Sequence, residues 1–108
     1  MQSEGHRFRT DKVTLLVERG EVAAARVGFT VSRRVGNSVV RNRVRRRLRE
    51  IVRLHQEVLV PGVEYVIVGA PSAAMAAYHA LEVDLVKLLG AARAWVVREA
   101  DASDCAGR

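Results

Sequence analysis

One segment constrains the fold of this chain more than any other, because residues 38–58 have the periodicity of an amphipathic helix. Apolar side chains recur there at spacings of three and four residues and occupy about a third of the circumference of a helix: Val40, Val44, Leu48, Ile51 and Val52. The preceding Gly36 breaks a strand-like pattern, and Asn37 or Ser38 is suited to cap the helix. The chain must therefore bury one face of this helix against its other elements.

Arginines occupy the opposite side of this predicted helix. From Arg26 to Arg53 the sequence has ten arginines and one acid, Glu50, so the segment is far more basic than the whole chain, whose net charge is +6. Exposed helix faces normally mix charges, because like charges four residues apart repel each other. A basic stripe on a nearly neutral body is typical of a protein that binds a polyanion. We interpret the arginine face as a contact with nucleic acid.

The other elements predict one small α/β domain, as suits 108 residues. Residues 12–19 and 26–33 are β-branched or alternating, and we expect them to be neighbouring antiparallel strands. Residues 64–68 predict a short apolar strand that is covered on both faces. A loop at 71–77 leads to a second amphipathic helix, and from about residue 100 we expect a frayed polar tail.

Several classes of protein are excluded by composition. No apolar run reaches the roughly 18 residues that span a bilayer, and residues 1–10 are polar, so we expect a cytoplasmic protein without membrane contact. The single cysteine, Cys105, excludes an internal disulfide and a cysteine-based zinc site. His6, His55 and His79 lie far apart and the acids are scattered, so we expect no metal site and no catalytic residue in this chain.

The central segment also carries a longer motif. Residues 26–49 read RVGFTVSRRVGNSVVRNRVRRRLR, in which Arg41-Asn42-Arg43 follows R-V-G-x-x-V-S and a pair of arginines. This pattern resembles the signature of the protein component of bacterial ribonuclease P, and the resemblance covers roughly residues 8–99. Ala-Pro-Ser-Ala at 70–73 and the closing helix also fit. Members usually begin with a further helix, which we expect to be absent here, so that residues 1–108 form a single RNA-binding domain.

The resemblance implies a fold and a function. The fold is an α/β (α+β) sandwich like domain 2 of ribosomal protein S5, with a small mixed sheet, the basic helix in a left-handed βαβ crossover, and a C-terminal helix. The implied function is that of a subunit of an endoribonuclease whose RNA subunit, with Mg²⁺, removes the 5′ leader of precursor tRNA. The protein would bind the RNA subunit through the Arg-Asn-Arg helix and the leader in a cleft between the sheet and the first helix. We expect one monomer per ribonucleoprotein.

The motif positions also imply which residues contact RNA. Arginines would hold phosphates through charge-assisted forks, and an asparagine would fix a turn or a base edge. The predicted set is Arg33, Arg34, Asn37, Arg41, Asn42, Arg43, Arg45, Arg46 and Arg49. We expect Phe29 to fill the core rather than to stack on a base. Two alternatives stay open, a non-enzymatic RNA-binding module of ribosomal-protein type and a helix-based DNA-binding protein.

Overall fold

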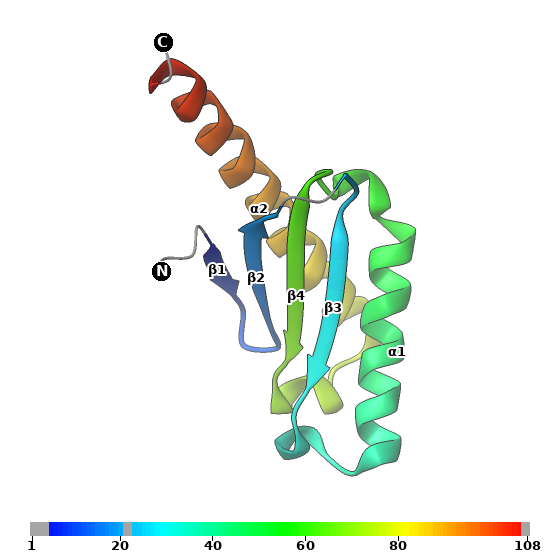
Figure 1. The fold of residues 1–108 in the computed structure, drawn as a ribbon. Coiled ribbons are helices and arrows are strands. Elements are labelled where there is room, and N and C mark those ends of the chain that lie inside the picture. Colours follow the sequence, from blue (N-terminus) through cyan, green and yellow to red (C-terminus); the bar gives the residue numbers. More distant parts are fainter. Residues whose placement is uncertain (1–4, 21–22, 107–108) are drawn as a thin grey trace.

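The computed structural model describes residues 5–20 and 23–106, with side chains described up to residue 98. It shows a four-stranded sheet and two long helices (Figure 1). The elements follow in the order β1 (His6–Arg9), β2 (Val13–Arg19), β3 (Arg26–Val31), α1 (Ser38–Leu54), β4 (Val63–Gly69) and α2 (Tyr78–Ala106), with short 3-10 turns η1 (Arg33–Val35), η2 (Gln56–Val58) and η3 (Pro71–Ala74) between them. The predicted mixed α/β fold class is confirmed.

The strand order β1-β2-β4-β3 corrects one prediction. β2 pairs antiparallel with both β1 and β4, whereas β3 pairs parallel with β4. The segments 12–19 and 26–33 are therefore not neighbours, since β4 lies between them. β4 is the most apolar strand, and in the centre of the sheet both of its edges are hydrogen-bonded, which leaves the more polar β1 and β3 at the edges.

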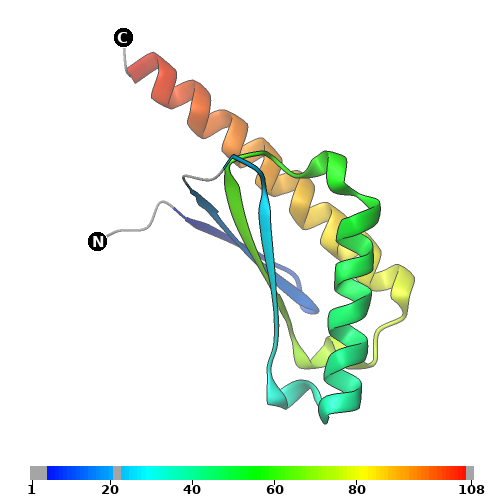
Figure 2. The ribbon, with the colours of Figure 1, turned by 45° about the vertical axis from the view of Figure 1, so that its right-hand side comes forward.

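Both helices pack on the same face of the sheet, as the two views in Figures 1 and 2 show. A single core forms between the layers from Val13, Leu15 and Val17 of β2, Tyr65 and Ile67 of β4, Val44, Leu48 and Ile51 of α1, and Leu81, Leu85 and Leu89 of α2. The prediction that residues 64–68 are covered on both faces is wrong. Val66 points to the opposite face and is 37% exposed, because no described helix lies on that face.

The connection from β3 through α1 to β4 is left-handed. In Figure 1 both strands run downward and both helices lie behind the sheet, while the chain passes from β3 on the right to β4 on the left. Parallel crossovers are right-handed in nearly all proteins, so this feature could not be derived from general rules. It agrees with the expectation that the resemblance gave. The crossover places α1 beside the outer edge of β3.

The structure has one strand that was not predicted, β1, and its last helix is longer than expected. β1 is mostly polar, but its aromatic side chains alternate with arginines, so that one face of the strand can pack on the helical layer. Phe8 packs against the core, and the His6 ring stacks on Trp95 of α2 with 5.2 Å between the ring centroids. At the other end α2 continues to Ala106, so the frayed tail expected from residue 101 is helical up to that point. Neither proline nor glycine interrupts the sequence between Gly90 and Gly107, which allows the helix to continue.

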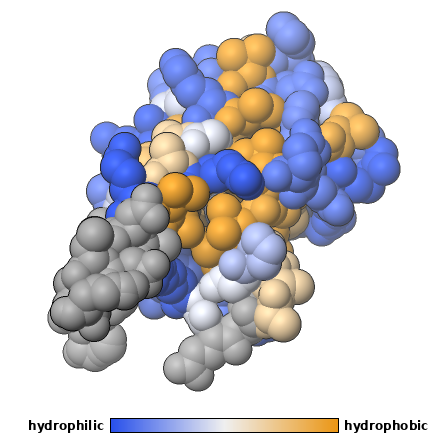
Figure 3. Space-filling view, turned by 90° about the horizontal axis from the view of Figure 1, so that it is seen from above, coloured by the Kyte–Doolittle hydropathy of each residue, from blue (hydrophilic) through white to orange (hydrophobic). Residues whose placement is uncertain are grey.

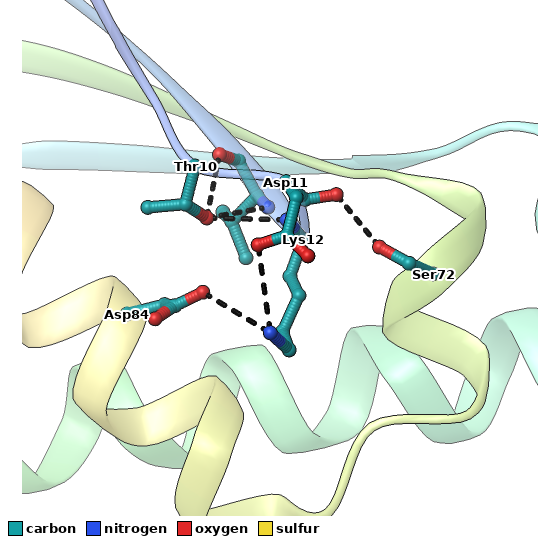
Figure 4. Close-up of polar contacts among 6 residues, drawn as sticks. Thr10, Asp11, Lys12, Ser72 and Asp84 are labelled. Carbon is teal, nitrogen blue, oxygen red and sulfur yellow. Dashed lines mark hydrogen bonds and ion pairs between the residues drawn. The ribbon is translucent and has the colours of Figure 1, made fainter.

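A polar network fixes the turn between β1 and β2 to the helical layer (Figure 4). The Thr10 hydroxyl oxygen accepts the backbone N–H groups of Lys12 and Val13, both at 3.2 Å. The Ser72 hydroxyl donates to the Asp11 carbonyl at 2.6 Å, and the Lys12 ammonium lies 3.8 Å from the Asp84 carboxylate of α2. These contacts hold η3 and α2 against the sheet at the end where α1 begins.

Candidate nucleic-acid interface

The start of α1 is built by a tight turn and a side-chain cap. The Asn37 side-chain oxygen accepts the Val40 backbone N–H at 3.0 Å, as the predicted cap requires. A Cβ atom at residue 36 would approach the Val40 side chain to 2.9 Å, so glycine is needed there. The Arg41 Nε atom donates to the Gly36 carbonyl at 3.2 Å. Asn37 was predicted both as a helix cap and as an RNA-contact residue, and the structure shows the role of a cap.

Arginines cover the outward side of α1 and the turn before it. Arg46 is exposed and has no hydrogen-bond or ion-pair partner among the described residues. The Arg45 guanidinium donates to the Asn42 side-chain oxygen at 2.8 Å, which orients both side chains on the surface. The Arg49 guanidinium lies 5.7 Å from the centroid of the Phe29 ring, beside the edge of β3.

Two arginines of α1 point the other way, toward the loop before α2. The Arg43 guanidinium donates to the Ala74 carbonyl at 3.3 Å, and the Arg47 guanidinium donates to the Ala76 carbonyl at 3.2 Å. Both side chains are half-buried, and the Arg43 Nε atom is buried without a hydrogen-bond partner among the described residues. Arg43 thus ties α1 to η3, and Arg47 ties it to the residues that follow η3. Arg43 therefore differs from the other arginines of the predicted RNA-contact set.

The charge of the outward face is nearly unopposed. Glu50 is the only acid in α1, and its carboxylate pairs with Arg53 at 2.7 Å. The hydrogen bond from Arg53 lowers the pKa of Glu50 and keeps it ionised. Six predicted arginines of α1 and η1 remain whose guanidinium groups could meet a polyanion: Arg33, Arg34, Arg46 and Arg49, which are exposed, and Arg41 and Arg45, which are half-buried.

Two acids of α2 and a histidine at the end of α1 take part in structural contacts. His55, at the end of α1, lies 3.0 Å from the Glu82 carboxylate of α2, and Asp84 pairs with Lys12. In the described residues no group of three or more His, Cys, Asp or Glu is placed to hold a metal ion. No described helix is long and apolar enough to cross a membrane.

A cleft that the sequence analysis did not foresee lies between β3 and the C-terminal half of α1. It has a volume of about 610 Å³, and its walls include Phe29, Arg49, Val52, Arg53 and Gln56. Phe29 packs against the core, as expected, but it is only half-buried and also lines the cleft. The sequence does show an aromatic residue, Phe29, shortly before the arginine helix. It does not show that the two are neighbours in space, because this depends on the crossover that sets α1 beside β3.

Comparison with known proteins gives a consistent result. The family model described as Ribonuclease P matches residues 1–93. The ribonuclease P protein component of Salinispora tropica is 51% identical over 72 residues, which are 67% of this chain and 53% of that protein. The corresponding protein of Natranaerobius thermophilus is 34% identical over 84 residues, which are 78% of this chain and 73% of that protein. With the component from Ruegeria pomeroyi, the match covers 45% of the relative, so the matched part spans about half the length of some relatives.

Solved structures of low sequence identity share the fold. The RNase P protein of Thermotoga maritima, in complex with 1-(4-fluorophenyl)-2-thiourea, superimposes with a TM-score of 0.73 at 23% identity, covering 81% of this chain and 85% of that one. The RNase P protein of Staphylococcus aureus gives a TM-score of 0.74 at 22% identity, with 82% of each chain covered. The family match, the relatives and the fold agree, and the chain belongs to the family of ribonuclease P protein components.

Proposed function

We propose that this chain acts as the protein subunit of ribonuclease P, an endoribonuclease that removes the 5′ leader of precursor tRNA. The observation that carries the proposal is the outward arginine face of α1 and η1, set on the fold of a family of ribonuclease P proteins. Six arginines of α1 and η1 are exposed or half-buried there, and the only acid of α1, Glu50, is already paired. Repulsion within such a face is relieved when a polyanion binds to it.

The arginine face would bind the catalytic RNA subunit. Guanidinium groups hold phosphate oxygens through pairs of parallel hydrogen bonds, which position an RNA without reading its sequence. Arg45 and Asn42 are already oriented toward each other by their 2.8 Å hydrogen bond. The Asn42 amide keeps its donor for a base edge or a turn of the RNA.

The 5′ leader would bind on the open face of the sheet, opposite the helices. A cleft of about 350 Å³ lies on that face, and its walls include Arg7, Leu16 and Val66. Arg7 and Arg9 alternate on the outward side of β1 and are exposed, so they could hold phosphates of an extended strand. The apolar Leu16 and Val66 offer a surface for bases.

The chemistry would belong to the RNA subunit. Mg²⁺, held mainly by that RNA, would stabilise charge during hydrolysis of the phosphodiester bond. The residues of this chain would bind, orient and neutralise the two RNA molecules. We propose a one-to-one complex of a protein monomer with its RNA subunit, located in the cytoplasm.

Reconstitution tests this proposal. The chain is added to its cognate RNA subunit, and cleavage of a 5′-extended precursor tRNA is followed at a low Mg²⁺ concentration at which the RNA alone is slow. We expect faster release of the leader, and a weaker stimulation by the Arg45→Ala/Arg46→Ala double variant. Equal binding of the RNA subunit and an unrelated structured RNA, without any stimulation, would instead support an RNA-binding module of ribosomal-protein type. Competition by duplex DNA at equal strength would support the DNA-binding alternative.

A further inference from the structure

The cleft between β3 and α1 has the composition of a site for a single nucleotide. One wall is the half-buried ring of Phe29, and Arg49 lies 5.7 Å from the centre of that ring. Arg53 and Val52 of α1 and Gln56 of η2 also line the cleft. Proteins that bind unpaired RNA combine an aromatic or guanidinium plane, on which a base stacks, with cations that hold its phosphate.

The size and shape of the cleft fit the same occupant. Its volume of about 610 Å³ lies within the range of roughly 300–1,000 Å³ that is usual for small-molecule sites. Pro61, Ala23 and Ala24, which also line the cleft, are exposed to solvent. The view from above, onto the end of the molecule where α1 ends, shows apolar surface with polar residues on both sides (Figure 3).

The edge of β3 adds polar groups to this cleft. In the described sheet β3 is hydrogen-bonded on one side only, to β4. The N–H and C=O groups on its other side therefore keep their hydrogen-bonding capacity, and Val27 and Phe29 of this strand line the cleft. Such groups can meet the polar edge of a base whose ring lies between Phe29 and α1. Arg53 is paired with Glu50, but the Arg49 guanidinium has no acidic partner among the described residues, and its charge favours an anionic occupant over a neutral peptide.

The cleft is continuous with the arginine face. Arg41, Arg45 and Arg49 follow one another at intervals of four residues along α1, which places neighbouring side chains side by side. Arg49 thus belongs both to the row of cations and to the wall of the cleft. An RNA backbone whose phosphates contact this row of arginines would therefore pass the opening of the cleft. At that point an unpaired base could turn out of the RNA helix and enter the cleft.

We propose that this cleft receives one unpaired base of the RNA that binds to α1, stacked against Phe29 and Arg49, with its phosphate held by the row of Arg41, Arg45 and Arg49. This proposal rests on the proposed function, because it assumes that the arginine face binds RNA. It adds a preference that phosphate contacts alone cannot give: the chain binds RNA with an unpaired nucleotide better than a fully paired duplex.

Titration of the full chain with two RNA probes tests the cleft. The probes are a short single-stranded oligoribonucleotide without self-complementarity and the same strand annealed to its complement. The sequence has only two phenylalanines, Phe8 and Phe29, so the ring resonances of Phe29 are identified by their loss in Phe29→Leu. We expect the NMR resonances of the Phe29 ring to shift as the single strand is added, until the change in chemical shift reaches a plateau. They should stay unchanged when the duplex binds.

Affinities supply a second readout. Loss of stacking in Phe29→Leu should weaken binding of the single strand by about 5- to 100-fold, as for other stacked bases, and should leave duplex binding within about 2-fold. Arg49→Lys keeps the charge but removes the planar group, and should show the same selective loss if Phe29→Leu does not fold. Val83→Ala removes an exposed apolar side chain of α2 outside the cleft and is the matched control.

The outcomes separate this proposal from the proposed function. If both RNAs bind and the Phe29 ring resonances do not move, or move equally with both, the cleft does not receive a base while RNA binding by α1 stands. An equal loss of affinity for both probes in Phe29→Leu and Arg49→Lys would overturn the cleft in the same way. If neither RNA binds the wild-type chain, both the cleft and the proposed function fail.

Discussion

Removing Arg43 should destabilise the protein, whereas removing Arg46 should weaken RNA binding. The two residues lie three positions apart on α1, but Arg43 donates to the Ala74 carbonyl at 3.3 Å and is half-buried, while Arg46 is exposed without a partner among the described residues. A hydrogen bond from a charged donor contributes about 1.5–3 kcal/mol, and this one is long, so we expect a loss of about 1–2 kcal/mol in Arg43→Ala. In a domain of this size that lowers Tm by roughly 4–10 °C.

Arg46→Ala should leave Tm within about 2 °C, because exposed substitutions change stability by less than about 0.5 kcal/mol. It should instead reduce the slope of log K against log salt by about 0.7–0.9, the value for one lost phosphate contact. Thermal unfolding by circular dichroism gives Tm, and filter binding to the RNA subunit at several salt concentrations gives the slope. An unchanged Tm with a reduced slope in Arg43→Ala would refute the assignment of Arg43 to the contact with η3.

Three further predictions concern single side chains. Asn42→Ala should weaken binding of the RNA subunit by about 5- to 100-fold in a gel-shift assay, since it leaves polar partners unpaired and releases Arg45; wild-type affinity would exclude a special role for the amide. Asn37→Ala should lower the free energy of unfolding in urea by about 1 kcal/mol through loss of the cap of α1, and Asn37→Asp should not; equal losses would show that the cap contributes nothing. Burial raises the pKa of Tyr65 above its ordinary value of 10.0, so the unfolded chain releases this proton first and stability should fall as pH rises past 10. In Tyr65→Phe this part of the decline should be absent in urea titrations, and an unchanged decline would show that Tyr65 does not cause it.

The sequence predicted α1 well because its information is local. Apolar residues at spacings of three and four, a capping asparagine and a preceding glycine all lie within residues 36–54. The start and the apolar face of this helix can be read without knowledge of distant residues, although its burial needs the other elements. The same holds for the strand character of β2, β3 and β4, whose β-branched residues and alternation are read within each segment.

Features that depend on distant residues could not be predicted. β4 inserts between β2 and β3 although it is later in the sequence, and a short connection between two strands suggested that they pair. The sequence also could not show which arginines of α1 have a structural role. Arg43 and Arg47 donate to carbonyl groups at residues 74–76, which are about 30 positions away in the chain, and nothing near them in the sequence indicates these contacts. The Phe29 cleft likewise exists only because the crossover sets α1 beside β3.

The salt dependence of binding to the ribonuclease P RNA subunit tests most directly whether the outward arginines of α1 and η1 form an RNA interface. Binding of the wild-type chain is measured over a series of monovalent salt concentrations at constant Mg²⁺, and log K is plotted against log salt. Six arginines engaged with six phosphates, at roughly 0.7–0.9 per phosphate, predict a slope of about −4 to −5. A slope shallower than about −2 would contradict the account, because at most two or three of these arginines could then be bound to the backbone of the RNA.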